Sequence, residues 1–412
     1  MFIKRNDCDI LVALEVGTSK VIAAVAELRT DGTMTLLGVG EVPSSGIRKG
    51  EIVDFQDAQT CIHQALHNAE KETDAEIREV YLTLTGSHIT SRTDMVRLTI
   101  TDEEKLVAHE HVSELNHLAQ SLVIPRDYVI VHSLLQRYCL DENVVSREPI
   151  GLSSSSLEGH YHLIYGLQTR LQTTVRCVHE QGVEICGYAL SSYAMAQAIL
   201  SPAAKQNGSV AIDMGAGITD YIVYVDGAVV HTGSVAVGGD HLTQDLAMGL
   251  RLPDQKAEQL KRQYGDLYMD GHHRDEKIVL ERDMTFEERS LYRDSMVKIL
   301  HVRQKELLSL IQQDLAARGL WPHLLGGVYI TGGASQMRGV ERMAREIFPA
   351  DVKFAHEHTF DGDQTYSKRP DLSTVLGLLR YAQRKEMAKA KPRGWRRIQQ
   401  SVVNILTAMR LL

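Results

Sequence analysis

Short apolar runs typical of buried β-strands alternate along the chain with amphipathic stretches typical of helices. The first run, VALEVG (12–17), contains one carboxylate and leads through hydroxyl residues into a second apolar run, VIAAVAEL. The same pattern returns 198 residues later as VAIDMG (210–215), followed by YIVYV. Each unit then passes through an Asp-Gly turn into a third strand. Two such units predict two related domains with a cleft between them.

The segments between and after these units predict a mixed α/β protein. VYLTLTG (80–86) has the composition of a strand, and a 3.6-residue apolar period predicts a long helix over 291–319. Thr101, followed three residues later by Glu104, has the form of a capping box. We therefore expect a helix over 101–122 that begins at Thr101.

Charge is distributed unevenly along the 412 residues. The net charge is −8, but 380–412 holds nine basic residues and one acidic residue, so the rest of the chain has a net charge near −16. This balance argues against nucleic acid as the main partner, because the protein lacks a general basic excess. The basic C-terminal stretch is instead typical of an interaction tail.

The five cysteines are scattered and form no CxxC pair, which suits a reducing compartment and disfavours a disulfide framework. The N-terminal residues contain no apolar core of a secretory signal, and no apolar run is long enough to span a bilayer. We therefore expect a soluble or peripheral protein.

The glycine-rich turns that follow Glu15 and Asp213 suggest a polyphosphate site. Backbone N–H groups in such turns can hold phosphate oxygens, and a neighbouring carboxylate can hold Mg²⁺ directly or through water. A single turn of this kind is ordinary hairpin chemistry, but two copies together with ITGGA (330–334) are difficult to explain as turns alone. The chain has no GxxxxGK[ST] motif, and Asp220 replaces the third glycine of a dinucleotide fingerprint.

Three motifs carry a resemblance to the actin/Hsp70/sugar-kinase superfamily: EVGTSK (15–20), DMGAGITD (213–220) and ITGGAS (330–335). Within that superfamily the whole chain resembles the FtsA family of bacterial cell-division actin homologues. VYLTLTGSHITS (80–91) is similar to the entry into the inserted module of that family, and DLSTVLGLLRYA (371–382) to its last core helix.

The resemblance implies an α/β, actin-like (ribonuclease H-like, duplicated) two-domain fold around a nucleotide cleft, with an FtsA-type inserted module and a C-terminal amphipathic helix. Domain I (subdomain IA) would comprise 1–85, 163–200 and 366–390, with the inserted module (subdomain IC) at 86–162. Domain II would comprise subdomain IIA (201–254 and 320–365) and subdomain IIB (255–319), and 391–412 would form the hinge and the membrane-targeting helix.

The resemblance also implies ATP and Mg²⁺ as ligands, with Glu15 and Asp213 ordering the metal and its waters. The nucleotide-binding residues would be Glu15, Gly17, Thr18, Ser19, Lys20, Asp213, Gly215, Ala216, Gly217, Thr219, Gly239, Glu258, Lys261, Gly332, Gly333 and Met337. Ile218 departs from the family pattern, because it replaces a threonine beside the β- and γ-phosphates. We therefore expect weak ATP hydrolysis or none, and we assign no catalytic residue.

The last 19 residues, GWRRIQQSVVNILTAMRLL, predict an amphipathic helix suited to an anionic membrane surface. The alternative is a helix that docks on the protein's own core. The KPRG hinge and the basic excess favour the membrane. The membrane-binding residues would be Trp395, Arg396, Arg397, Ile398, Val402, Ile405, Leu406, Met409 and Leu412.

The resemblance further implies that the protein polymerises on the cytoplasmic side of the inner membrane at the division septum. It would anchor FtsZ filaments of the Z-ring there and recruit later division proteins through the inserted module. Arg289, Arg293 and Arg303 would bind the FtsZ C-terminal peptide. The alternatives are a shape-determining or pilus-assembly actin homologue, or an actin-fold kinase or phosphatase. The tail together with the module favours FtsA over all of these.

Overall fold

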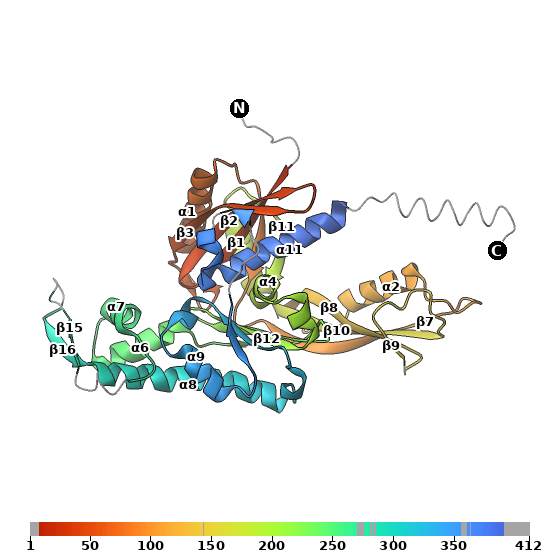
Figure 1. Ribbon diagram of the computed structural model, residues 1–412. Helices are drawn as coiled ribbons and strands as arrows, with labels where there is room; N and C mark the ends of the chain where they lie inside the picture. Colours follow the sequence, from red (N-terminus) through yellow and green to blue (C-terminus); the bar gives the residue numbers. More distant parts are fainter. Residues whose placement is uncertain are drawn as a thin grey trace.

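The computed structural model describes residues 8–390, apart from 143, 270–275, 281, 283–285, 356–360 and 363. Two large mixed sheets, a smaller third sheet and the helices around them make an elongated molecule (Figure 1). Among the described residues, no helix is both long enough and apolar enough to cross a membrane.

The first sheet has the strand order β11-β6-β1-β2-β3-β19. Its strands are β1 (Cys8–Val16), β2 (Lys20–Arg29), β3 (Met34–Pro43), β6 (Glu79–Leu84), β11 (Glu184–Leu190) and β19 (Asp361–Gly362). Alternate side chains of β1 and β2 point to opposite faces of the sheet, and both faces are apolar and buried. One face packs on α1 (Phe55–Thr73) and α3 (Gln168–His179), and the other on α4 (Ser191–Ile199) and α11 (Ser373–Ala390).

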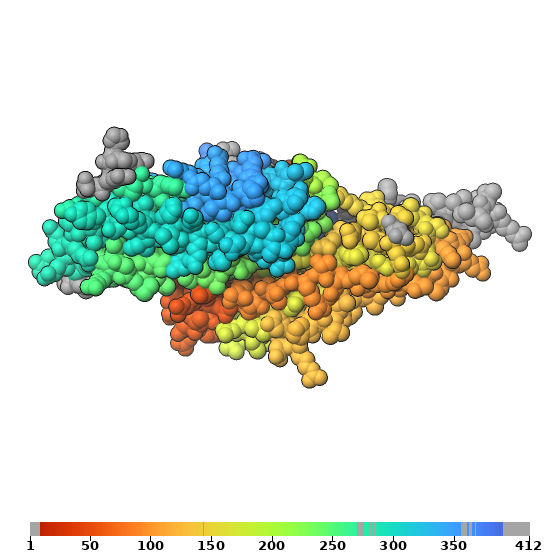
Figure 2. Space-filling model, turned by 90° about the horizontal axis from the view of Figure 1, so that it is seen from below, coloured from red at the N-terminus to blue at the C-terminus, as the bar shows by residue number. Residues whose placement is uncertain are grey.

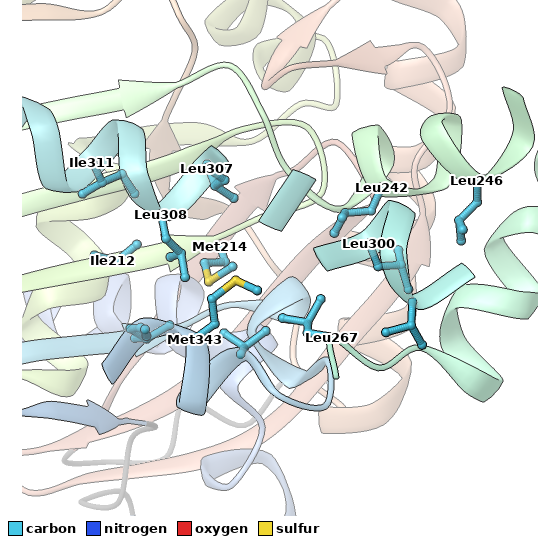
Figure 3. Close-up of a cluster of buried hydrophobic side chains, with 14 of the residues drawn as sticks. Ile212, Met214, Leu242, Leu246, Leu267, Leu300, Leu307, Leu308, Ile311 and Met343 are labelled. Carbon is cyan, nitrogen blue, oxygen red and sulfur yellow. The ribbon is translucent and has the colours of Figure 1, made fainter. Parts of the chain in front are cut away.

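The second sheet has the strand order β14-β13-β12-β17-β18. Its strands are β12 (Ser209–Met214), β13 (Thr219–Val225), β14 (Ala228–Val235), β17 (Gly327–Thr331) and β18 (Val352–Phe354). One face packs on α4 and α5 (Pro202–Gln206). The other face packs on α6 (Gly239–Leu250), α8 (Arg293–Ala317) and α9 (Val340–Ile347), with α7 (Asp254–Tyr264) alongside. Figure 3 shows this larger core, where Ile212 and Met214 of β12 lie among leucines of α6 and α8.

The predicted internal repeat is confirmed by the topology of the two sheets. In each sheet an antiparallel three-stranded meander is followed by two strands parallel to its first strand: β1 is the counterpart of β12, and β6 is the counterpart of β17. The turns also match, because Gly17 N–H donates to the Lys20 carbonyl at 3.1 Å and Gly215 N–H donates to the Ile218 carbonyl at 3.1 Å.

The inserted module is a four-stranded sheet of order β7-β10-β8-β9 that carries one helix on one face. Its elements are β7 (Thr90–Thr99), α2 (His109–Gln120), β8 (Tyr128–Leu140), β9 (Val144–Ser146) and β10 (Ser156–Leu167). The module and the β15–β16 hairpin (Lys277–Leu280 and Arg289–Tyr292) occupy opposite ends of the molecule (Figure 1). Figure 2 shows the same elongated outline from below, with the module at one end.

The prediction that the module's helix begins at Thr101 is wrong, because α2 begins at His109. Lys105 has a positive φ of 50°, and Leu106 forms a bridge with Ser153 across the loop. The N-terminal cap is instead made by the His111 ring, which accepts a hydrogen bond from Ala108 N–H at 3.0 Å. The contact between Leu106 and Ser153, which are distant in the sequence, therefore outweighs the local capping pattern.

The remaining short elements are β4 (Ile47–Arg48), β5 (Glu51–Ile52), α10 (Gln364–Ser367) and the 3₁₀ helices η2 (Trp321–His323), η3 (Gly333–Gln336) and η4 (Pro370–Leu372). The β4–β5 hairpin places Lys49 and Gly50 between the turns that follow β1 and β12. This position gives the hairpin contacts with both halves of the molecule.

Candidate functional site

A cleft of about 1410 Å³ separates the two large sheets, and both duplicated turns open into it. All the predicted nucleotide-binding residues except Thr219 line this cleft. The exception follows from strand alternation, because Thr219 begins β13 and points into the protein, where its hydroxyl donates to the Val237 carbonyl at 2.9 Å. Its neighbour Ile218 lines the cleft instead.

Glu15 and Asp213 lie at equivalent positions near the ends of β1 and β12, and both lie at the floor of the cleft. The first turn of α11 meets both carboxylates: Thr374 Oγ1 donates to Asp213 Oδ2 at 2.6 Å, and Val375 N–H donates to Glu15. Glu15 Oε2 is buried and has no hydrogen-bond partner among the described residues.

Burial raises the cost of ionising both acids, and the charge of Asp213 adds to that cost at Glu15. Burial, with the charge of Asp213 as the next cause, raises the pKa of Glu15 from 4.5 to about 8. Burial also raises the pKa of Asp213 from 3.8 to about 6, against the hydrogen bond from Thr374. A buried, unpartnered carboxylate oxygen beside a second carboxylate has the chemistry of a cation site.

Backbone close to the cleft leaves no room for side chains at two glycines. Gly332 has a φ of +93°, and a Cβ there would lie 2.3 Å from Asp213 Oδ1. A Cβ at Gly217 would lie 2.6 Å from Thr18 Oγ1, so the turn of the second sheet touches the turn of the first. The two turns therefore face one another directly.

Lys20, predicted to face phosphates, is held in a network of four charges at the edge of the cleft. Its ammonium group binds Asp371 and lies 3.2 Å from Glu41. Arg369 binds the same two acids, Glu41 at 2.8 Å and Asp371 at 2.5 Å. Although burial opposes it, hydrogen bonding to Arg369 and Lys20 lowers the pKa of Asp371 to about 2.

Glu258 and Lys261 project from α7 toward α6 on the opposite wall. Lys261 Nζ donates to the Gly239 carbonyl at 2.8 Å and lies 2.6 Å from Glu258 Oε2. Burial opposes ionisation of Glu258, but the charge of Lys261 together with hydrogen bonds from Lys261, Thr243 and Arg262 lowers the pKa of Glu258 to about 2. This wall therefore offers both a carboxylate acceptor and an ammonium donor to the cleft.

Several cleft residues were missed from the sequence. Asp220 accepts hydrogen bonds from Thr85 Oγ1 at 2.9 Å and Ser191 Oγ at 2.7 Å, and burial raises its pKa. Its place in the GITD motif was the available signal. Asp371 precedes α11 and Thr374 lies in its first turn, where no phosphate motif marks them.

The three arginines predicted to bind an acidic peptide differ in their surroundings. Arg293 pairs with Glu276 at 2.7 Å, and its side chain is only 13% exposed. Arg303 chelates Asp245 at 2.5 and 2.9 Å and also pairs with Glu306. Arg289 is exposed, with one long hydrogen bond to the Arg251 carbonyl at 3.4 Å. The predicted membrane-binding residues, from Trp395 to Leu412, and the hinge at 391–394 lie outside the described residues.

Comparisons with known proteins agree with this architecture. A family model described as cell division protein FtsA matches 210–377, and one for the SHS2 domain inserted in FtsA matches 86–165. Among solved structures, the chain is similar to the PilM–PilN type IV pilus biogenesis complex (TM-score 0.62, 13% identity, 89% of this chain and 97% of that one). It is also similar to ADP-bound MreB5 of Spiroplasma citri (TM-score 0.55, 15% identity, 92% and 98%). The predicted actin-like α/β fold with an inserted module is confirmed.

Curated relatives extend the match over almost the full length. Cell division protein FtsA of Pseudomonas aeruginosa is 31% identical over 376 residues, 91% of this chain and 90% of the relative. The Escherichia coli K12 protein of that name is 30% identical over 386 residues (92% and 91%), and the Bacillus subtilis one is 28% identical over 400 residues (97% and 89%). The chain therefore belongs to the FtsA family of cell division proteins.

Proposed function

We propose that this FtsA-family protein binds ATP with Mg²⁺ in the cleft and serves as an actin-like adaptor in cell division. The observation that carries the nucleotide site is the facing pair Glu15 and Asp213, with the Glu15 Oε2 atom buried and without a hydrogen-bond partner in the part of the chain that the structure describes. Binding of ADP by the solved MreB5 structure of the same fold supports the choice of ligand.

The residues present fit a magnesium ion. Mg²⁺ prefers carboxylate and water oxygens and is usually held by one or two carboxylates together with substrate phosphates. Glu15 and Asp213 would supply the carboxylates, and bound Mg²⁺ would neutralise the phosphate charge. The unfavourable burial of the Glu15 charge would then be offset by a ligand rather than by a side chain.

The two turns would hold the phosphates from opposite sides. Gly17, Thr18 and Ser19 present their backbone from the first sheet, and Gly215 to Gly217 present theirs from the second. Lys20 would reach the phosphates by leaving Asp371, which keeps Arg369 as a partner. Glu258 and Lys261 would meet the ribose or adenine, with Gly332, Gly333 and Met337 against the nucleoside.

We further propose the cellular arrangement that the family resemblance implies. The chain would polymerise on the cytoplasmic face of the inner membrane at the septum, attached through 391–412. Binding by one such helix is reversible, so polymerisation would be needed for stable attachment. The proposed domain boundaries are those given above for domain I, the inserted module at 86–162, domain II and the tail. The module would be the surface that binds later cell-division proteins.

The proposed partner of the β15–β16 end is the FtsZ C-terminal peptide. Arg289 is the exposed cation of the three arginines, so we assign it the primary contact. Arg303 and Arg293 are already paired with acids of this chain, and an acidic peptide would have to displace those acids to bind them.

Binding of a fluorescent ATP analogue, followed by anisotropy with and without Mg²⁺, tests the nucleotide site. We expect Asp213→Asn to weaken Mg²⁺-dependent binding by about tenfold or more, since one charged ligand is lost. Asp351→Asn is the matched control, because Asp351 is exposed and pairs only with Lys353 among the described residues. Equal affinities for the Asp213→Asn variant and the unaltered protein would contradict the proposal.

A further inference from the structure

Three potential metal ligands converge on the face of the module sheet that lies away from α2. They are Cys139 of β8 and Glu158 and His160 of β10, and one ligand atom from each lies within 4.8 Å of the others. The strand register places Glu158 directly opposite Cys139. His160 is two residues further along β10, on the same face.

The alternation along β10 separates this cluster from the module's core. Leu157, Tyr161 and Leu163 point toward α2 and form the apolar core with Leu115. Glu158 and His160 point to the other side, where Val145 of β9 is exposed beside Cys139. The three polar side chains therefore form a separate cluster at the edge of solvent.

The cluster has unused bonding capacity. Within the described part of the chain, neither the Cys139 thiol nor the His160 ring makes a hydrogen bond, although Cys139 is buried. Cys61, Cys177 and Cys186 differ, because each donates to an oxygen. Glu158 is held by Arg97 at 3.5 Å, and Arg97 is shared with Glu142 at 2.8 Å.

We propose that Cys139, Glu158 and His160 form a zinc-binding site in the inserted module. A thiolate, an imidazole and a carboxylate suit Zn²⁺, with a water as the fourth ligand in a tetrahedral site. Zinc–ligand bonds of about 2.0–2.3 Å require ligand atoms about 3.5 Å apart. The ligand atoms lie within 4.8 Å of one another, so side-chain rotations that move each atom by roughly an ångström would close the site. His160 is partly exposed, which leaves an entry path for the metal and room for the water.

The three side chains can supply the donor atoms and the charge that Zn²⁺ requires. A neutral imidazole such as that of His160 offers a nitrogen lone pair to the metal. Thiolate and carboxylate together balance the two charges of Zn²⁺. The thiol must lose a proton on binding, so the affinity for zinc falls as the pH is lowered.

Titration of the chelator-treated full-length protein with Co²⁺, in buffer containing excess Mg²⁺, tests the site. Co²⁺ replaces Zn²⁺ in tetrahedral sites and gives an absorption spectrum that reports its ligands. We expect about one equivalent to produce a near-ultraviolet thiolate-to-cobalt charge-transfer band, with visible bands of tetrahedral cobalt, and Zn²⁺ to abolish both. Oxygen-only sites such as the cleft cannot give the thiolate band.

Four variants separate the proposed site from incidental binding. Cys139→Ser should abolish the charge-transfer band, and His160→Asn should weaken cobalt binding by about tenfold or more. Cys186→Ser and His63→Gln are matched controls, because Cys186 is an exposed cysteine elsewhere and His63 lies beside His67 on α1. Absence of the band in the unaltered protein, which needs no variant to fold, would overturn the proposal. Persistence of the band in Cys139→Ser would also overturn it.

Discussion

The Thr374 hydroxyl donates a hydrogen bond of 2.6 Å to the Asp213 carboxylate, and so joins the start of α11 to the end of β12. One residue later, Val375 N–H donates to Glu15 from the first sheet. The N-terminus of a helix carries a partial positive charge, which favours nearby anions. This helix end therefore compensates part of the repulsion between the two carboxylates, and a bound cation would complete the compensation.

Stability in the absence of ligand should fall as the pH rises through the range in which these acids ionise. The folded-state pKa values, about 8 for Glu15 and about 6 for Asp213, exceed the ordinary values of 4.5 and 3.8. The folded protein thus binds more protons than the unfolded chain between those limits. The contribution of these two carboxyl groups to the free energy of unfolding is complete below about pH 4 and is lost as the pH approaches about 8.

Denaturant unfolding at several pH values measures this effect. We expect Glu15→Gln to reduce the decrease in the free energy of unfolding with rising pH. We also expect Mg²⁺ with ADP to stabilise the unaltered protein more at pH 8 than at pH 6. Glu341→Gln, an exposed acid on α9, should leave the profile unchanged. Parallel profiles for Glu15→Gln and the unaltered protein would show that Glu15 does not carry the raised pKa.

Ile218 should limit ATP turnover more than ATP binding. The residue is 7% exposed, lines the cleft and approaches Gly50 of the β4–β5 hairpin. Ile218→Thr restores a hydroxyl near the phosphates, at a cost in packing of about 1–2 kcal/mol. We expect faster phosphate release with nucleotide affinity changed by less than about tenfold.

Ile218→Val is the matched control for that substitution, because it removes a methylene without adding a hydroxyl. A coupled phosphate-release assay compares the two variants. If Ile218→Thr releases phosphate no faster than Ile218→Val, the missing hydroxyl is not what limits hydrolysis.

Arg289 should contribute more to binding of the FtsZ C-terminal peptide than its two predicted companions. Arg289→Glu should weaken peptide binding by about tenfold or more, because an exposed cation becomes a repulsive charge. Calorimetry with a synthetic peptide measures this, with Arg345→Glu on the exposed face of α9 as the control. Equal loss in both variants would indicate a general charge effect and not a peptide site.

The basic tail should be required for attachment to anionic vesicles. Flotation of the full chain should depend on anionic lipid and decrease with salt, whereas a chain ending at Lys391 should stay in the soluble fraction. Vesicles of zwitterionic lipid serve as the control. Equal flotation of the two chains would exclude the tail as the anchor.

The sequence predicts the duplicated sheets and most of the cleft, because each motif lies on one strand and its adjoining turn. Thr219 shows that not every residue of a binding motif lines the site. Strand alternation turns its side chain inward, while Ile218 faces the cleft. The Lys20–Asp371 pair joins residues 351 positions apart, and the Arg303–Asp245 pair joins residues 58 apart. Such pairs depend on how distant elements pack together, which local patterns do not encode.

The central claim is that Glu15 and Asp213 hold the metal of a bound nucleotide. A crystal structure with ADP and Mn²⁺ in place of Mg²⁺ tests it most directly, because manganese gives an anomalous signal. We predict one anomalous peak between the two carboxylates, bound to them directly at about 2.1 Å or through a single water, and next to the phosphates. A nucleotide bound with its metal away from both carboxylates, or no nucleotide in the cleft, would contradict the claim.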